Sequence, residues 1–79
     1  MKPKATEIKD AIMVIVGRST RPQSCWVVKQ KLQKSFGIDI TFDLSYRFLC
    51  ELAADGRLEK GKRKTLDGYD FVFTMAGES

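Results

Sequence analysis

The chain has 79 residues, of which 43% are hydrophobic and 30% are charged. This length supports one small hydrophobic core, and the apolar fraction argues against intrinsic disorder. The formal net charge of +4 favours polyanionic partners without requiring them. We therefore expect a single domain over residues 1–79, with residues 1–5 disordered at its start.

Several functional classes are disfavoured by residues that the sequence lacks. It contains no histidine and only two cysteines, Cys25 and Cys50, so a four-ligand zinc site is incomplete and we expect no metal or cofactor. The apolar run at residues 11–16 is too short for a membrane span or a signal peptide. No glycine-rich phosphate loop follows a strand, and no spacing suggests a base beside a nucleophile. We expect a cytoplasmic protein that is not an enzyme and has no membrane partner.

The first predicted element is an amphipathic helix that begins near Thr6 and stops at Gly17. Its apolar side chains recur at intervals of three and four residues, as one face of a helix requires. These side chains are Ile8, Ala11, Ile12, Ile15 and Val16.

A second helix is predicted to follow Ser24, which is a favourable N-cap residue. Gly37 suits the left-handed position after its last turn, and Ile38 is expected to fold back onto the helix end. Trp26 lies off the apolar stripe, and we expect it to complete the core; an exposed Trp26 would instead mark a partner surface. The buried stripe consists of Cys25, Val28, Leu32 and Phe36.

A third helix is expected after residues 38–40, which read either as a small edge strand or as an extended turn. Thr41 or Asp43 caps this helix, and the turn dipeptide Asp55-Gly56 ends it. The predicted buried stripe consists of Leu44 or Ser45, then Phe48, Leu49, Leu52 and Ala53.

The remainder predicts a β-hairpin with a cationic turn. A strand containing Leu58 enters a turn at about residues 61–68, and an aromatic strand leaves it. Tyr69, Phe71 and Phe73 share one face of that strand. Such a row is also typical of a stacking surface for single-stranded nucleic acid, but we expect the core to require this face. The cations are placed at the hairpin tip, where they suit a phosphate backbone or serve as a solubilising edge. They are Lys60, Lys62, Arg63 and Lys64.

Four parts of the chain carry a family resemblance: residues 49–58, the basic turn, residues 69–74 and Gly77. In these parts the chain resembles the winged helix-turn-helix superfamily of small bacterial DNA-binding regulators. These motifs are specific for the fold but not for a subfamily. The resemblance implies an α+β fold with three helices and a C-terminal antiparallel wing hairpin of two to three strands. It also implies DNA binding through the third helix and the wing.

The leading hypothesis is a double-stranded DNA-binding protein and small transcriptional regulator, with the third helix in the major groove and the basic wing on the phosphate backbone. The alternative is a winged-helix module that docks on a partner protein, which Asp43 and Glu51 on the third helix favour. A homodimer is a further possibility, because one module of this size binds weakly. The candidate DNA contacts are Arg21, Ser24, Thr41, Ser45, Tyr46, Arg47, Lys60, Lys62, Arg63 and Lys64.

Overall fold

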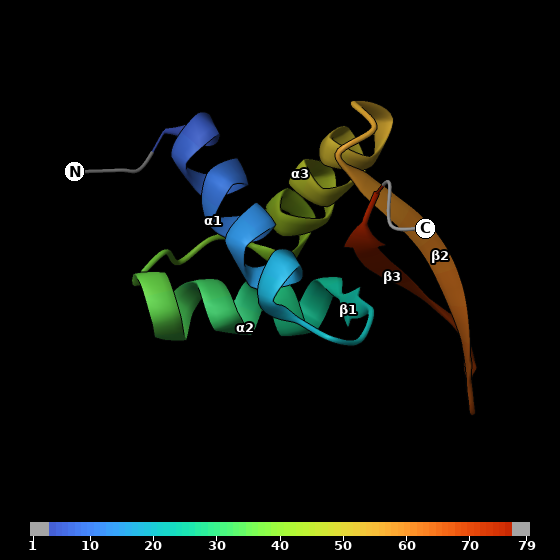
Figure 1. Ribbon diagram of the computed structural model, residues 1–79. Helices are drawn as coiled ribbons and strands as arrows, with labels where there is room; N and C mark the ends of the chain where they lie inside the picture. The colour runs from blue at the N-terminus through green and yellow to red at the C-terminus, as the bar shows by residue number, and fades with distance from the viewer. Residues whose placement is uncertain (1–3, 77–79) are drawn as a thin grey trace.

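The computed structural model describes residues 4–76, which form three helices and a three-stranded antiparallel sheet (Figure 1). The elements are α1 (Ala5–Arg18), β1 (Gln23–Ser24), α2 (Cys25–Phe36), α3 (Phe42–Ala54), β2 (Leu58–Thr65) and β3 (Gly68–Met75). The helices cross one another on one side, and the β2–β3 hairpin extends away from them as a long ribbon (Figure 1). This arrangement of three helices and a C-terminal hairpin confirms the predicted fold class.

Helix α1 is longer at both ends than its sequence pattern predicts. It begins at Ala5, so Lys4 rather than Thr6 is the N-cap residue, and the carboxylate of Glu7 accepts a 3.4 Å hydrogen bond from the Lys4 N–H group. The helix continues through Gly17 to Arg18. Ala5 therefore belongs to the helix, whereas the first three residues of the expected disordered lead lie outside the described residues.

The core forms where the apolar stripes of the helices meet β3. The predicted stripe of α1 is buried throughout, as are three of the four residues predicted for α2. Phe36 is the exception, because it lies in the last turn of α2, beside the exposed Val14 at the surface. Gly37 has a φ of 66°, and the Ile38 N–H donates to the Leu32 carbonyl at 3.1 Å, which confirms the predicted helix stop.

The third strand of the sheet is not the edge strand that was one of the two alternatives for residues 38–40. Residues 38–40 form no strand, and β1 instead consists of the two residues before α2. Gln23 pairs with Phe73 and Ser24 pairs with Val72, so β3 is the central strand of the sheet. This pairing depends on a distant segment of the chain, which explains why local patterning did not indicate it.

Helix α3 begins where predicted. Thr41 is its N-cap residue, and its hydroxyl oxygen accepts a hydrogen bond of 3.1 Å from the Leu44 N–H group. After Ala54, Gly56 adopts a φ of 80°, which suits the glycine of the predicted stop. The buried side chains of α3 are Ser45, Phe48, Leu49 and Leu52, while Leu44 and Ala53 are half-buried.

The hairpin is more regular than predicted. Thr65 pairs with Gly68, so only Leu66 and Asp67 form the turn and all four predicted tip cations lie within β2. Leu58 and Phe73 are buried in the core, as predicted for Phe73. Tyr69 and Phe71 are exposed, because the hairpin extends beyond the helices, so the prediction that the core needs the whole aromatic row was wrong.

Candidate nucleic-acid interface

Three lysines of β2 share one face of the wing with the aromatic row of β3. Residues that pair directly in an antiparallel ladder point to the same side of the sheet. The register pairs Lys60 with Phe73, Lys62 with Phe71 and Lys64 with Tyr69. This face adjoins α3, because the Tyr46 ring lies 6.1 Å from the Phe71 ring and 6.4 Å from the Phe73 ring.

Lys60 connects the wing to α3. Its Nζ atom donates a 2.9 Å hydrogen bond to the Tyr46 hydroxyl and lies 3.8 Å from the Cys50 Sγ atom. The same Nζ atom is 4.1 Å from the centre of the Phe71 ring, a cation–π contact. The hydrogen bond that Lys60 donates to the Tyr46 hydroxyl is the main reason that the pKa of Lys60 is raised above its ordinary value. The ammonium group is therefore charged and held at a fixed place between wing and helix.

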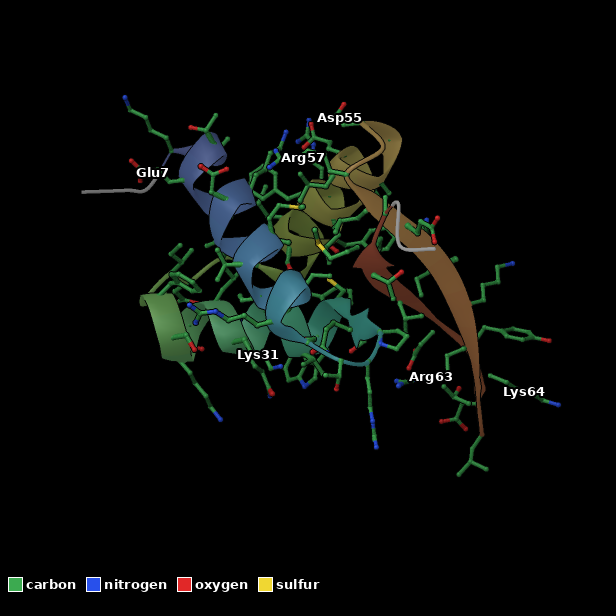
Figure 2. The ribbon with its side chains drawn as sticks, in the orientation of Figure 1. Glu7, Lys31, Asp55, Arg57, Arg63 and Lys64 are labelled. Carbon is green, nitrogen blue, oxygen red and sulfur yellow. The ribbon has the colours of Figure 1, made fainter. Side chains whose placement is uncertain are left out.

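Arg63 lies on the opposite face of the hairpin. It forms an ion pair of 3.6 Å with Asp70, and Figure 2 shows Arg63 and Lys64 leaving opposite sides of the ribbon. Arg63 and Arg21 border a surface hollow of about 570 Å³ between the wing and the start of α2. The wing cations therefore do not form one cluster at a tip, as the sequence predicted, but are divided between two faces.

The exposed face of α3 carries Arg47 and Asp43, and Glu51 lies toward its border with α1. The Glu51 carboxylate is 3.8 Å from the Nζ atom of Lys9 on α1. One of the two acidic residues that favoured a protein-docking role thus has a basic partner within the same domain.

Three candidate contacts are serine or threonine residues, and each of them either caps a helix or lies within one. Ser45 is fully buried, because helical spacing turns this side chain into the core, and we therefore do not propose it as a DNA contact. The Ser24 hydroxyl oxygen accepts a 3.4 Å hydrogen bond from the Val27 N–H group, and Thr41 caps α3 in the same way. Ser24 and Thr41 nevertheless remain at helix N-termini, which are favourable positions for a phosphate.

An aromatic cleft, which we define by Trp26, Phe42, Tyr46, Tyr69 and Phe71, was missed by the sequence interpretation. It has a volume of about 300 Å³ and lies between the starts of α2 and α3 and the wing. Trp26 is exposed, so the prediction that it completes the core was wrong: it lies in the first turn of α2 and off the buried stripe. Its position off that stripe was the available signal.

Among residues 4–76, no three side chains of the metal-binding types come together, and no helix is long and apolar enough to cross a bilayer. Both cysteines are free, with Cys25 buried and Cys50 half-buried. Burial raises the pKa of the Cys25 thiol, which keeps it protonated and unreactive near neutral pH.

Neither a protein-family model nor a curated protein matches the sequence. The structure is similar to the X-ray structure of a PadR-like transcription factor from Bacteroides fragilis, with a TM-score of 0.76 and 19% sequence identity. The similarity covers 92% of this chain and 69% of that chain. Together with the order of the elements, it shows that the chain has the winged helix-turn-helix fold, with α2 and α3 as the helix pair and the β2–β3 hairpin as the wing.

Proposed function

We propose that this protein binds double-stranded DNA as a transcriptional regulator, with α3 in the major groove and the wing on the phosphate backbone. The observation that carries the proposal is the contact between Lys60 and Tyr46, which joins the lysine face of the wing to α3. One continuous surface then presents cations to a polyanion. A similar fold occurs in a protein described as a transcription factor, which supports the same function.

The proposed contacts have different roles. Lys62 and Lys64 are exposed on the wing and neutralise phosphates, which contributes affinity without sequence preference. Arg47 is exposed on α3 and contacts base edges or the phosphates beside them. Arg21 and Arg63 serve a phosphate on the other side of the wing, next to the N-terminus of α2.

One domain of this size offers a small DNA contact, so we infer that the protein acts as a homodimer or together with a protein partner. In a bacterial cell, this function implies a cytoplasmic location. Docking on a partner protein is the second candidate function, and the exposed Trp26 and Phe42 favour it, because large aromatic residues are common anchors of protein interfaces.

Salt-dependent DNA binding tests the leading proposal. Fluorescence anisotropy of a labelled duplex is measured between about 50 mM and 200 mM salt for the wild type and a Lys62→Ala, Lys64→Ala double variant. The slope of log K against log salt should become shallower by about two, because two phosphate contacts are lost.

The matched control is a Lys4→Ala, Lys34→Ala double variant, which removes the same charge from exposed positions outside the wing. This control should keep the wild-type slope. Equal losses in the two double variants would show that only net charge matters. Absence of binding by the wild type at about 50 mM salt would reject DNA binding.

A further inference from the structure

The aromatic cleft presents flat ring surfaces to solvent that the core does not use. Trp26 is 54% exposed, Phe42 is 45% exposed and Tyr69 is 69% exposed. The core is filled instead by other side chains, including Phe73, which is fully buried and lies on β3 with Tyr69. The volume of about 300 Å³ is at the lower end of the range for small-molecule sites, so the cleft accommodates a group about the size of one ring system.

Lysine ammonium groups lie against the rings of the cleft. The Nζ atom of Lys29 is 5.8 Å from the Trp26 ring. On the wing side, the Nζ atoms of Lys60 and Lys62 lie 4.1 Å and 5.9 Å from the Phe71 ring. Cations thus approach the cleft both from α2 and from β2, and they sit beside ring faces rather than in a separate patch. The cleft lining also contains one acidic residue, Asp70, whose carboxylate forms an ion pair of 3.6 Å with Arg63.

This combination of chemistry fits an unpaired nucleotide better than a peptide or a paired duplex. An unpaired base offers a flat π-surface to aromatic side chains, and its neighbouring phosphates offer negative charge to the lysines. Paired bases are stacked inside the duplex and do not expose their faces. An apolar peptide would use the rings but would leave the surrounding ammonium groups without acidic partners.

We infer that the aromatic cleft binds one unpaired nucleobase of DNA, stacked against Trp26 and Tyr69, with the flanking phosphates at Lys29 and Lys62. The inference rests on the proposed function, because the lysine face of the wing brings the phosphate backbone to the cleft. It adds a preference for sites where a base is bulged, flipped or single-stranded.

Three labelled duplexes of one sequence test this inference: one fully paired, one with a single bulged thymine, and one with a bulged abasic nucleotide. The thymine bulge should bind about 5- to 100-fold more tightly than the abasic bulge, which keeps the same backbone without a base to stack. Trp26 is the only tryptophan in the chain, so its fluorescence reports directly on the cleft. Its emission should be quenched more strongly by the thymine bulge than by either other duplex.

Two variants test whether the preference for the thymine bulge arises in the aromatic cleft. Phe42→Ala and Tyr69→Ala should remove the preference for the thymine bulge and leave the affinity for paired duplex unchanged. Phe36→Ala is the matched control, because Phe36 is also exposed, at 42%, but lies outside the cleft, and it should keep the preference.

The outcomes separate this inference from the proposed function. Equal affinity for the two bulges would overturn the inference, while binding of paired duplex would still support the proposed function. Binding of the thymine bulge without binding of paired duplex would support the inference and overturn the major-groove proposal. Quenching of Trp26 by an aromatic peptide but by no DNA would assign the cleft to a protein and also overturn the inference.

Discussion

The Nζ atom of Lys60 on β2 donates a 2.9 Å hydrogen bond to the Tyr46 hydroxyl on α3. This bond joins the wing to the third helix, two elements that the proposed DNA contact requires in a fixed relation. It also fixes the Tyr46 ring, which packs beside Phe71 and Phe73. Strand β2 is therefore positioned by side-chain contacts with α3 as well as by its ladder with β3.

Replacing Tyr46 by phenylalanine should lower the pKa of Lys60 toward its ordinary value of 10.5, because the main cause of its increase is the Tyr46 hydroxyl. The contribution of this bond to stability is present below pH 10.5 and is lost as the pH rises through the higher pKa of the folded state. NMR titration of the lysine side chains measures the change. An unaltered Lys60 pKa in the Tyr46→Phe variant would contradict the assigned cause.

Ser45→Ala should be neutral or raise the free energy of unfolding by up to about 1 kcal/mol, since a buried hydroxyl without a partner opposes folding. The Ser45 Oγ atom is buried and makes no hydrogen bond of standard geometry among residues 4–76, although the Cys25 thiol lies close enough for Ser45 to lower the Cys25 pKa against the larger effect of burial. A weak contact with a thiol satisfies the hydroxyl less well than an oxygen or nitrogen partner would. Urea unfolding followed by circular dichroism measures the difference, and DNA affinity should not change.

Thr41→Ala provides the contrast for that measurement, because it removes a hydroxyl that caps α3. It should lower the free energy of unfolding by about 1 kcal/mol. A Ser45→Ala variant that loses as much stability as Thr41→Ala would show that the Ser45 hydroxyl is hydrogen-bonded in the folded protein.

The two thiols should differ in reactivity. Cys50 is half-buried and should react first with a chromogenic disulfide reagent, whereas Cys25 should react only as the domain unfolds. A Cys50→Ser variant isolates the signal of Cys25. Rapid labelling of Cys25 in that variant under native conditions would be inconsistent with its burial.

The raised pKa of Cys25 also predicts a stability change with pH. Between the ordinary value of 9.0 and the higher value in the folded state, the unfolded chain releases the proton more readily, so stability falls as the pH rises above 9.0. Urea unfolding at several alkaline pH values should show a steeper loss of stability for the wild type than for a Cys25→Ala variant. Parallel losses in both proteins would exclude this linkage.

Gly37→Ala should destabilise the domain by about 1 kcal/mol, because a side chain disfavours the left-handed conformation that ends α2. Gly61→Ala is the control: this glycine has no positive φ, and an added Cβ would meet only the Val72 Cγ2 atom at 3.8 Å. Thermal unfolding compares the two variants. Equal melting temperatures would contradict the role of the left-handed conformation.

Features set by short-range spacing were predictable from the sequence. The buried stripe of α1, the Thr41 cap and the Gly37 stop each depend on residues a few positions apart, and the structure confirms them. The β1 strand was not predictable in this way, because its two residues gain strand geometry only by pairing with β3.

The candidate site was harder to predict than the fold, because it depends on how far each element extends beyond the core. Phe73 and Tyr69 occupy equivalent alternating positions on β3, yet one is buried and the other is exposed, according to the reach of the helices. The cations of β2 were assigned to the hairpin tip because the predicted turn ran from about Gly61 to Gly68, whereas the ladder continues to Thr65 and Gly68. Their contacts with aromatic residues on the neighbouring strand, as between Lys62 and Phe71, appear only after the hairpin pairs.

The short turn at Leu66 and Asp67 leaves β2 regular to its end, so odd and even positions of this strand face opposite ways. Lys62 and Lys64 are then about 6.6 Å apart along the strand, and the regular backbone of β2 sets this interval, which a flexible loop would not do. Inserting a single residue between them would move one lysine to the side of Arg63. Whether a cation of β2 lies on one face of the wing or the other thus depends on whether its residue number is even or odd. Insertion or deletion of one residue would therefore disturb the distribution of charge more than the exchange of one cation for another.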